Sequence, residues 1–245
     1  MAEFMLKNAR ILVSGADLSG QMNEVTVTYS AEMLDRTTFG SSARKRMAGL
    51  RDFQVAGGGF VDFATTKKAS PHLWSKLGTT AGVVTVSANS SKGAPCYTGA
   101  QVESEFAFGG SIGELAKFNF AGFGDGYAVK GVLAEGGTGL STTLSATPRS
   151  LGVKGTTKRL YGIVHIRAGA SSGNQKLVFG IQTASSSGFT SATTALKMTS
   201  VGGGAPTGQI KFTAGSTVHT WYRVRVKSSG TAGGKVTGFV AIAIQ

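Results

Sequence analysis

Cysteine, proline and charge are all scarce in this 245-residue chain, and each scarcity removes a class of protein. There is one cysteine, Cys96, so the chain can form no intramolecular disulfide and no multi-cysteine metal site. We expect it to be a small buried or half-exposed thiol. Charged residues make up 15% of the chain and prolines number four, whereas glycines number 37. A weakly charged, turn-rich sequence with many Ser and Thr favours an all-β protein.

Long apolar runs and targeting signals are also missing. No run of about 18 apolar residues occurs, so no membrane-spanning helix is predicted. The start of the chain, MAEFMLKNAR, lacks an apolar segment followed by a small-residue cleavage site, and no signal peptide is predicted. We therefore expect the protein to be made and assembled in a cytoplasm, with no membrane partner.

Histidine is also scarce. His72, His165 and His219 are the only histidines, and none has the spacing of a metal-ligand pair. His165 alternates with Val164 and Ile166 along a predicted strand, so we expect it on the surface of a sheet. The sequence also has no G-x-S-x-G nucleophile motif. We expect no catalytic, cofactor-binding or metal site.

Acidic residues nearly disappear from the second half of the chain. Residues 1–130 contain 13 Lys+Arg and 11 Asp+Glu, whereas residues 131–245 contain 12 Lys+Arg and a single acid, Glu135. A pair of carboxylates for acid–base catalysis is therefore excluded there. In the first half, Glu103 and Glu105 alternate along a predicted strand and indicate a solvated face or an interface stripe. The dispersed cations of the second half favour contact with an acidic protein surface over a dedicated nucleic-acid site.

The most informative segment is residues 17–60. Residues 22–29 alternate, with Val25, Val27 and Tyr29 on one face, which predicts a half-buried strand. A second strand is predicted from Asp52. Between them, residues 30–51 are expected to form a long loop with a short helix over residues 41–47. A loop of this length is uncommon in a compact β domain unless it contacts a partner.

This segment resembles the major tail tube proteins of long, non-contractile-tailed bacteriophages. The resemblance rests on D-L-S-G at residues 17–20, E-M-L-D-R-T-T-F-G at 32–40, G-L-R-D-F at 49–53 and G-G-G-F at 57–60. It implies a β-sandwich or half-barrel with one short flanking helix. It also implies a structural virion protein rather than an enzyme.

The resemblance carries further expectations about assembly. The subunits would close into rings, either trimers with pseudo-sixfold symmetry or hexamers, and the rings would stack into a tube. Partners would be a tape-measure protein, tail terminator and tip proteins, and DNA that passes through the lumen without sequence-specific binding. The protein would belong to the virion tail and assemble in the host cytoplasm. Such lumens are commonly acidic or neutral, whereas this subunit carries a net charge of +13. We therefore expect the cations of the second module to face outward or to pair with acids of a neighbouring subunit.

Two β modules are predicted on either side of a loose connection. The first covers residues 1–133, the connection residues 134–157, and the basic second module residues 158–245. A serine cap, a proline and a following glycine predict a helix over residues 70–78, with Leu73, Trp74 and Leu77 as its apolar face. Both modules have a long excursion between apolar strands, so we expect two related β units.

Two surfaces are the candidate sites. The inter-ring contact is predicted in the loop, at Asp35, Arg36, Phe39, Arg44, Arg46 and Leu50. An intersubunit or outer basic face is predicted at Arg223, Arg225 and Lys227, which alternate with apolar Tyr222, Val224 and Val226. The alternative functions are a phage capsid decoration or tail-fibre β module, and a basic DNA-binding coat protein.

Overall fold

The computed structural model describes residues 8–62, 69–140, 145–168, 176–198, 201–202, 207–214, 219–229 and 236–245. Parts of the predicted modules and of the connection, such as residues 1–7 and 141–144, lie outside the described residues. Within the described residues the chain is all-β with one short helix, as the sequence predicts. No helix among these residues is long and apolar enough to cross a membrane.

Seven strands and the helix belong to the first half of the chain. They are β1 (Arg10–Val13), β2 (Ala16–Asp17), β3 (Met22–Asp35), β4 (Arg46–Phe60), α1 (Ala69–Lys76), β5 (Gly82–Ser87), β6 (Pro95–Gly109) and β7 (Lys117–Leu140). The second half contributes β8 (Arg149–Ser150), β9 (Leu160–Ala168), β10 (Lys176–Ala184), β11 (Thr193–Lys197), β12 (Val201–Gly202), β13 (Thr207–Thr213), β14 (Trp221–Ser229) and β15 (Val236–Ile244).

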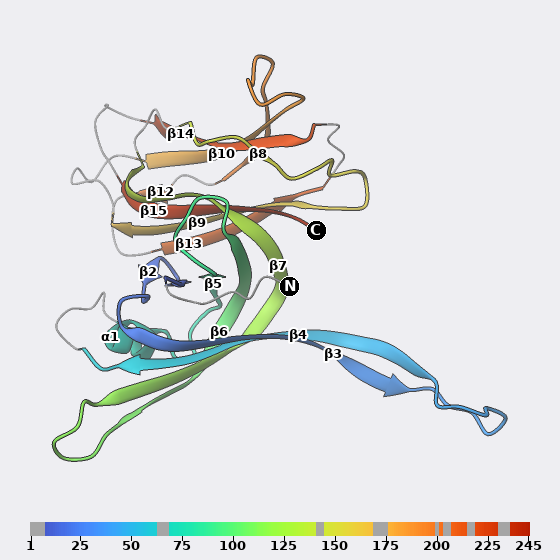
Figure 1. The fold of residues 1–245 in the computed structure, drawn as a ribbon, viewed down its shortest axis with the longest axis vertical. Helices are drawn as coiled ribbons and strands as arrows, with labels where there is room; N and C mark the ends of the chain where they lie inside the picture. The colour runs from blue at the N-terminus through green and yellow to red at the C-terminus, as the bar shows by residue number, and fades with distance from the viewer. Residues whose placement is uncertain are drawn as a thin grey trace.

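The larger of two sheets joins both halves. Its order is β13-β9-β15-β7-β6-β5-β1-β2, and β4 also pairs with β7 and carries β3 on its other side. The centre is β7, a curved strand that pairs with β4 and β6 in its first part and with β15 in its second (Figure 1). The prediction of a loose connection is therefore wrong over residues 134–140. These residues are strand, because β15 hydrogen-bonds to them.

A second sheet, β11-β10-β14-β8 with β12 beside β10, lies over β9 and β15 (Figure 1). The apolar faces of the two layers form one core that includes Leu160, Val164, Phe179, Tyr222 and Val240. This is a β-sandwich, and the predicted alternation of β14 is confirmed, since Tyr222, Val224 and Val226 are buried.

The first half has its own core between the β3-β4-β7-β6 sheet, α1 and the β1–β5 pair. Phe53, Val55, Phe118 and Phe120 from the sheet meet Leu73 of α1 there. The predicted helix is confirmed, and Gly78 follows it with φ of +64°. Its predicted apolar face is wrong in part: Leu73 is buried, but Trp74 is 62% exposed and Leu77 37% exposed, because α1 turns Ala69, Ser70 and His72 towards the core instead.

The prediction of a long loop over residues 30–51 is wrong. Residues 30–35 and 46–51 extend β3 and β4, and the pairing continues to Asp35 and Arg46. The expected helix over 41–47 is also absent, since those residues are bend, irregular backbone and strand. Both faces of this ribbon are exposed, so its sequence has no alternation of apolar and polar residues that would predict strands. A short helix here would have no apolar surface to pack against, and such a helix is not stable by itself.

Candidate functional site

The most prominent feature of the molecule is a two-stranded arm formed by the distal parts of β3 and β4 (Figure 1). Strand β4 pairs with β7 from Gln54 to Phe60, and from Phe53 towards the turn its only partner among the described strands is β3. The eight residues from Arg46 to Phe53 and their partners in β3 therefore form a two-stranded ribbon. It is roughly 25 Å long at the usual rise per strand residue. Isolated two-stranded ribbons are marginally stable in water, so this arm is suited to packing against a partner.

Hydrogen bonds order the turn of the arm. The Asp35 carboxylate accepts from the backbone N–H of Thr37 at 2.8 Å, and the Thr37 hydroxyl accepts from the N–H of Lys45 at 2.9 Å. The Arg36 N–H donates to the Lys45 carbonyl across the turn. Hydrogen bonds from Thr37 lower the pKa of Asp35, which keeps the carboxylate charged. Asp35 therefore holds the turn in one conformation.

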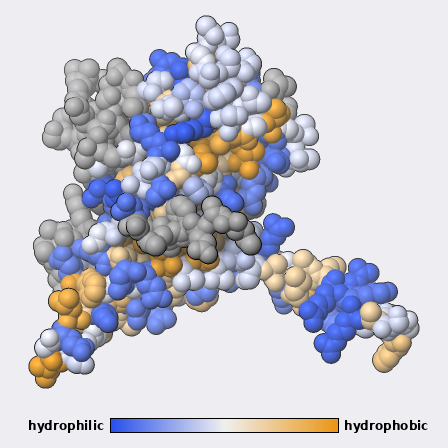
Figure 2. All heavy atoms as spheres, viewed as in Figure 1, coloured by the Kyte–Doolittle hydropathy of each residue, from blue (hydrophilic) through white to orange (hydrophobic). Residues whose placement is uncertain are grey.

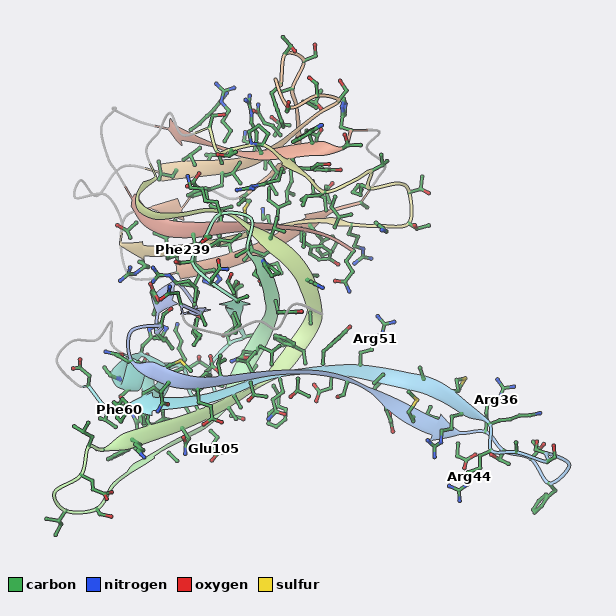
Figure 3. The ribbon with its side chains drawn as sticks, in the orientation of Figure 1. Arg36, Arg44, Arg51, Phe60, Glu105 and Phe239 are labelled. Atoms are coloured by element: carbon green, nitrogen blue, oxygen red, sulfur yellow. The ribbon has the colours of Figure 1, made fainter. Side chains whose placement is uncertain are left out.

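The structure brings the six predicted inter-ring residues together on this arm. All of them are exposed: Asp35, Arg36, Phe39, Arg44, Arg46 and Leu50. Phe39 is fully exposed and Leu50 is 82% exposed, although both are large and apolar. Figure 3 labels Arg36 and Arg44 near the end of the arm and Arg51 nearer the body.

The four strands β3-β4-β7-β6 form a sheet with one covered and one open face. The covered face packs on the first core, where Trp74 of α1 meets Phe106 edge to face at 6.0 Å between ring centroids. The open face carries mostly small, polar and acidic residues: Glu24, Thr26, Thr28, Asp52, Gln54, Ala56, Glu105, Ala107, Asn119 and Ala121. The half-exposed rings of Phe60 and Phe123 lie on the same face. A shallow depression of about 350 Å³ lies on it between Glu24, Ala56, Glu105 and Asn119.

This sheet also has two free edges in the part of the chain that the structure describes. Strand β3 pairs with β4 alone over its whole length. On the other side, residues 105–109 of β6 pair with β7 alone, because the pairing of β6 with β5 ends at Gln101. Exposed strand edges offer unpaired N–H and C=O groups to another chain.

A second hairpin turn, residues 110–116 between β6 and β7, carries another apolar end. Ile112 is fully exposed and Leu115 is 72% exposed. Gly113 has φ of +90°, and the Glu114 N–H closes the turn on the Ser111 carbonyl. This turn is not among the predicted sites, although two large apolar residues inside a Gly- and Ser-containing turn are a signal of an exposed apolar site.

The predicted outer basic face lies on the sheet surface away from the sandwich core. Arg223 is held in place, with its guanidinium carbon 4.3 Å from the Phe189 ring centroid and its Nε donating to Gln182 Oε1 at 2.9 Å. Arg225 and Lys227 are exposed and line a depression of about 250 Å³. The lone acid of residues 131–245, Glu135, is buried and paired with Lys92 at 2.6 Å, so no carboxylate from this part of the chain opposes these cations at the surface.

Two predictions about buried groups are wrong. His165 is not on a sheet surface but fully buried, with Nε2 hydrogen-bonded to Thr85 Oγ1 at 2.8 Å and Nδ1 accepting from the Gly15 N–H. Desolvation lowers its pKa to about 3. Glu103 is also buried rather than solvated, and desolvation raises its pKa to about 7, opposed by a hydrogen bond from Gln101 at 2.7 Å.

The His165 and Glu103 side chains both lie in the interior and do not belong to a candidate site. Segments far apart in the sequence cover them, which the alternation of single strands does not reveal. Cys96 is buried as expected, and desolvation raises the pKa of its thiol to about 12. Within the described ranges, no three His, Cys, Asp or Glu side chains are grouped so as to hold a metal ion.

Comparison with known proteins gives a limited result. No family model matches the sequence. No curated protein matches it either. Among solved structures, the chain is similar to one in the virion of a native gene transfer agent particle, at 17% identity over 48% of this chain and 92% of that chain, with a TM-score of 0.40.

Two further solved structures are similar at the same level. One is a chain in the tail of an empty gene transfer agent particle with C6 symmetry, at 19% identity over 48% of this chain and 92% of that chain, with a TM-score of 0.39. The other is SPP1 Dit, described as a paradigm of the hub adsorption apparatus in phages infecting Gram-positive bacteria. It is 13% identical over 98% of this chain and 100% of its own, with a TM-score of 0.39.

Proposed function

We propose that this chain is a structural virion protein that polymerises as stacked rings into a phage tail tube, the conduit for DNA ejection. The observation that carries the proposal is the β3-β4-β7-β6 sheet, which is free at both edges, covered on one face and open on the other. The motifs of residues 17–60, which lie on β3 and β4 and beside them, resemble those of tail tube proteins. The protein would then reside in the virion tail after assembly in the host cytoplasm.

Ring closure follows from the two free edges. If the β3 edge of one subunit pairs with residues 105–109 of the next, every subunit uses both of its edges. A closed ring leaves no edge exposed, which removes the aggregation hazard of an open sheet. The contact is heterologous, and it closes when the rotation between neighbours divides a full turn. One such sheet per chain in the described residues favours six chains per ring over a pseudo-sixfold trimer.

The distribution of charge supports the proposed DNA conduit. The open face would line the lumen, and it carries Glu24, Asp52 and Glu105 against Lys117. In Figure 3, Glu105 lies on the side of the sheet away from the body. Arg223, Arg225 and Lys227 belong to the other sheet of the molecule, where they would face outward or towards a neighbouring subunit. DNA would therefore meet few cations that release its counterions.

Further partners of the protein follow from this role. A tape-measure protein would occupy the lumen during assembly, and terminator and tip proteins would cap the two ends of the tube. None of these contacts requires sequence-specific binding of DNA.

Negative-stain electron microscopy of the purified protein over a concentration series tests the proposal. We expect hollow tubes with regular striations, whose end views give sixfold symmetry. Compact closed trimers without a channel would instead support a capsid decoration or tail-fibre module. Tight duplex binding that is lost at high salt would support a DNA-binding coat protein.

A further inference from the structure

We propose that the outer face of the second sheet binds a linear acidic polysaccharide in a groove whose floor is Gly180. The groove is the depression of about 250 Å³ described above, here called the basic groove. Its lining includes Gly180 and Gln182 of β10, Thr194 and Lys197 of β11, and Arg225 and Lys227 of β14. This binding does not depend on whether the protein forms a tube.

The pairing of three strands builds the basic groove. Gly180 of β10 is paired with Arg225 of β14 on one side and with Lys197 of β11 on the other. Cross-strand partners point to the same face of a sheet, so the two cations flank a position that has no side chain. Their backbones lie about 10 Å apart at the usual spacing of neighbouring strands. A Cβ atom on Gly180 would meet no heavy atom of another segment closer than 3.7 Å, so the space above the glycine is open.

The cations of the basic groove lack acidic partners. Lys197, Arg225 and Lys227 are exposed, and none of them has a salt bridge within the described part of the chain. The lone acid of the second half of the chain is buried and already paired. Desolvation and the like charge of Arg225 lower the pKa of Arg223, which lies beside the groove. An anion bound in the groove relieves this repulsion between like charges.

The remaining groups suit a chain of sugars that carries acid groups. Arg225 and Lys227 lie two residues apart on one strand, about 7 Å at the usual rise, so they can contact two acid groups of one extended polymer. Arginine binds a carboxylate through two parallel N–H donors. The Thr194 hydroxyl and the Gln182 amide line the same groove and can hydrogen-bond to sugar hydroxyls. Arg223 holds the amide in place, since its Nε donates to Gln182 Oε1 at 2.9 Å.

Nucleic acids fit the basic groove less well. A single strand binds through aromatic platforms as well as cations, and none of the described residues that line the groove is aromatic. Phe189 lies beside it, but this ring is buried under the Arg223 guanidinium. A duplex, whose major groove alone is about 12 Å wide, is too wide to enter.

An acidic protein surface also fits the basic groove less well. Protein partners bind through buried aromatic and aliphatic anchors. The most exposed large apolar side chains of the described residues, Phe39 and Ile112, lie instead on the arm turn and on the 110–116 turn. Figure 2 shows apolar residues at the tips of both projections, which belong to the first half of the chain. The basic groove therefore favours a hydroxyl-rich polymer over a protein.

Binding of a fluorescently labelled oligogalacturonate, a linear polymer with one carboxylate on each sugar, tests the proposal. We expect Lys197→Gln with Arg225→Gln to weaken its binding at least tenfold, because each replacement removes a charge-assisted hydrogen-bond donor. The matched control is Lys158→Gln with Lys211→Gln, which removes the same charge at exposed residues outside the groove. Equal weakening by the two double variants would mean general charge attraction and would overturn the proposal.

Gly180→Leu tests the shape of the basic groove without a change of charge. The added side chain fills the open space above β10, so we expect binding at least tenfold weaker with unchanged thermal unfolding. Wild-type affinity in this variant, with its fold checked by circular dichroism, would show that the polymer binds elsewhere.

Three further probes decide the class of ligand. Neutral dextran should not bind, because it has the hydroxyls without the acid groups. Oligothymidylate and polyglutamate should bind more weakly than the oligogalacturonate. Binding of either that is as tight or tighter would assign the groove to a nucleic acid or to an acidic protein and overturn the polysaccharide. All measurements use protein below the concentration at which it assembles, so these outcomes leave the tail tube proposal standing.

Discussion

Glu103 is a buried carboxyl group whose protonation is coupled to folding. Its pKa is raised from 4.5 to about 7 in the folded protein, so the folded state binds the proton more tightly than the unfolded state. The stability that it contributes is complete below about pH 4.5 and is lost as the pH rises through 7. That loss is about 3 kcal/mol.

Glu103→Gln tests this coupling, because Gln keeps the shape and can still accept from Gln101. Between pH 4.5 and 8, we expect the unfolding free energy of the wild type to fall by about 3 kcal/mol relative to the variant. Urea unfolding at several pH values measures the difference. His165 is present in both proteins, so its contribution cancels in the difference between their unfolding free energies. A constant difference across this range would mean that Glu103 is charged throughout.

Gly15 lies directly against the backbone of the second half of the chain, at Ile166 and Thr207. It follows Ser14 in the turn between β1 and β2, has φ of +91°, and a Cβ atom there would overlap the backbone of Thr207. We expect Gly15→Ala to lower the unfolding free energy by about 2–4 kcal/mol. Thermal unfolding measures the loss. Gly20→Ala, where no atom lies within 4 Å of the added Cβ, should change stability by no more than about 1 kcal/mol.

At the scale of the element, the arm separates folding from assembly. Its apolar residues from Met33 to Leu50 lie outside all four buried clusters. We expect Phe39→Ser with Leu50→Ser to leave the unfolding free energy within about 0.5 kcal/mol of the wild type. Tube formation should be lost, because burial of each side chain contributes about 1.5–3 kcal/mol to a contact.

Thermal unfolding of these samples checks that stability is unchanged, and sedimentation checks that tube formation is lost. Val153→Ser, a polar change at another exposed residue, should alter neither. Loss of folding in the arm variant would show that the arm packs on its own chain.

At the scale of the whole molecule, the acids of the open face and the cations of β14 lie on different sheets. We expect Glu24→Lys with Glu105→Lys to assemble into tubes whose inner wall binds duplex DNA at low salt and releases it at high salt. Filter binding on assembled tubes measures the affinity and its salt dependence. Replacing Arg223, Arg225 and Lys227 by Gln is the comparison, and this variant should not raise DNA affinity. Equal binding by both variants would contradict the placement of the open face towards the lumen.

The sequence by itself determined the elements with strong local patterns. Tyr222, Val224 and Val226 alternate with cations, so β14 and its two faces could be predicted, because a strand repeats every two residues. Pro71 and Gly78 predicted α1 for the same local reason, but the helix begins at Ala69, so Ser70 lies inside it and is not its cap. Sparse charge with abundant Gly, Ser and Thr indicated the all-β class. The six residues predicted for the inter-ring contact lie together and exposed on the arm, although the predicted loop is wrong, and their role stays a prediction.

Only the tertiary structure decided what covers each face and where each turn lies. His165 is buried because Gly15 and Thr85, 150 and 80 residues away, close over it. The arm is strand because Asp35 pairs with Arg46, and a ribbon exposed on both faces leaves no periodic pattern. The opposite positions of the two projecting turns follow from the antiparallel pairing of β4 with β7. Such long-range pairing depends on contacts between distant segments, and no local pattern of residues encodes it.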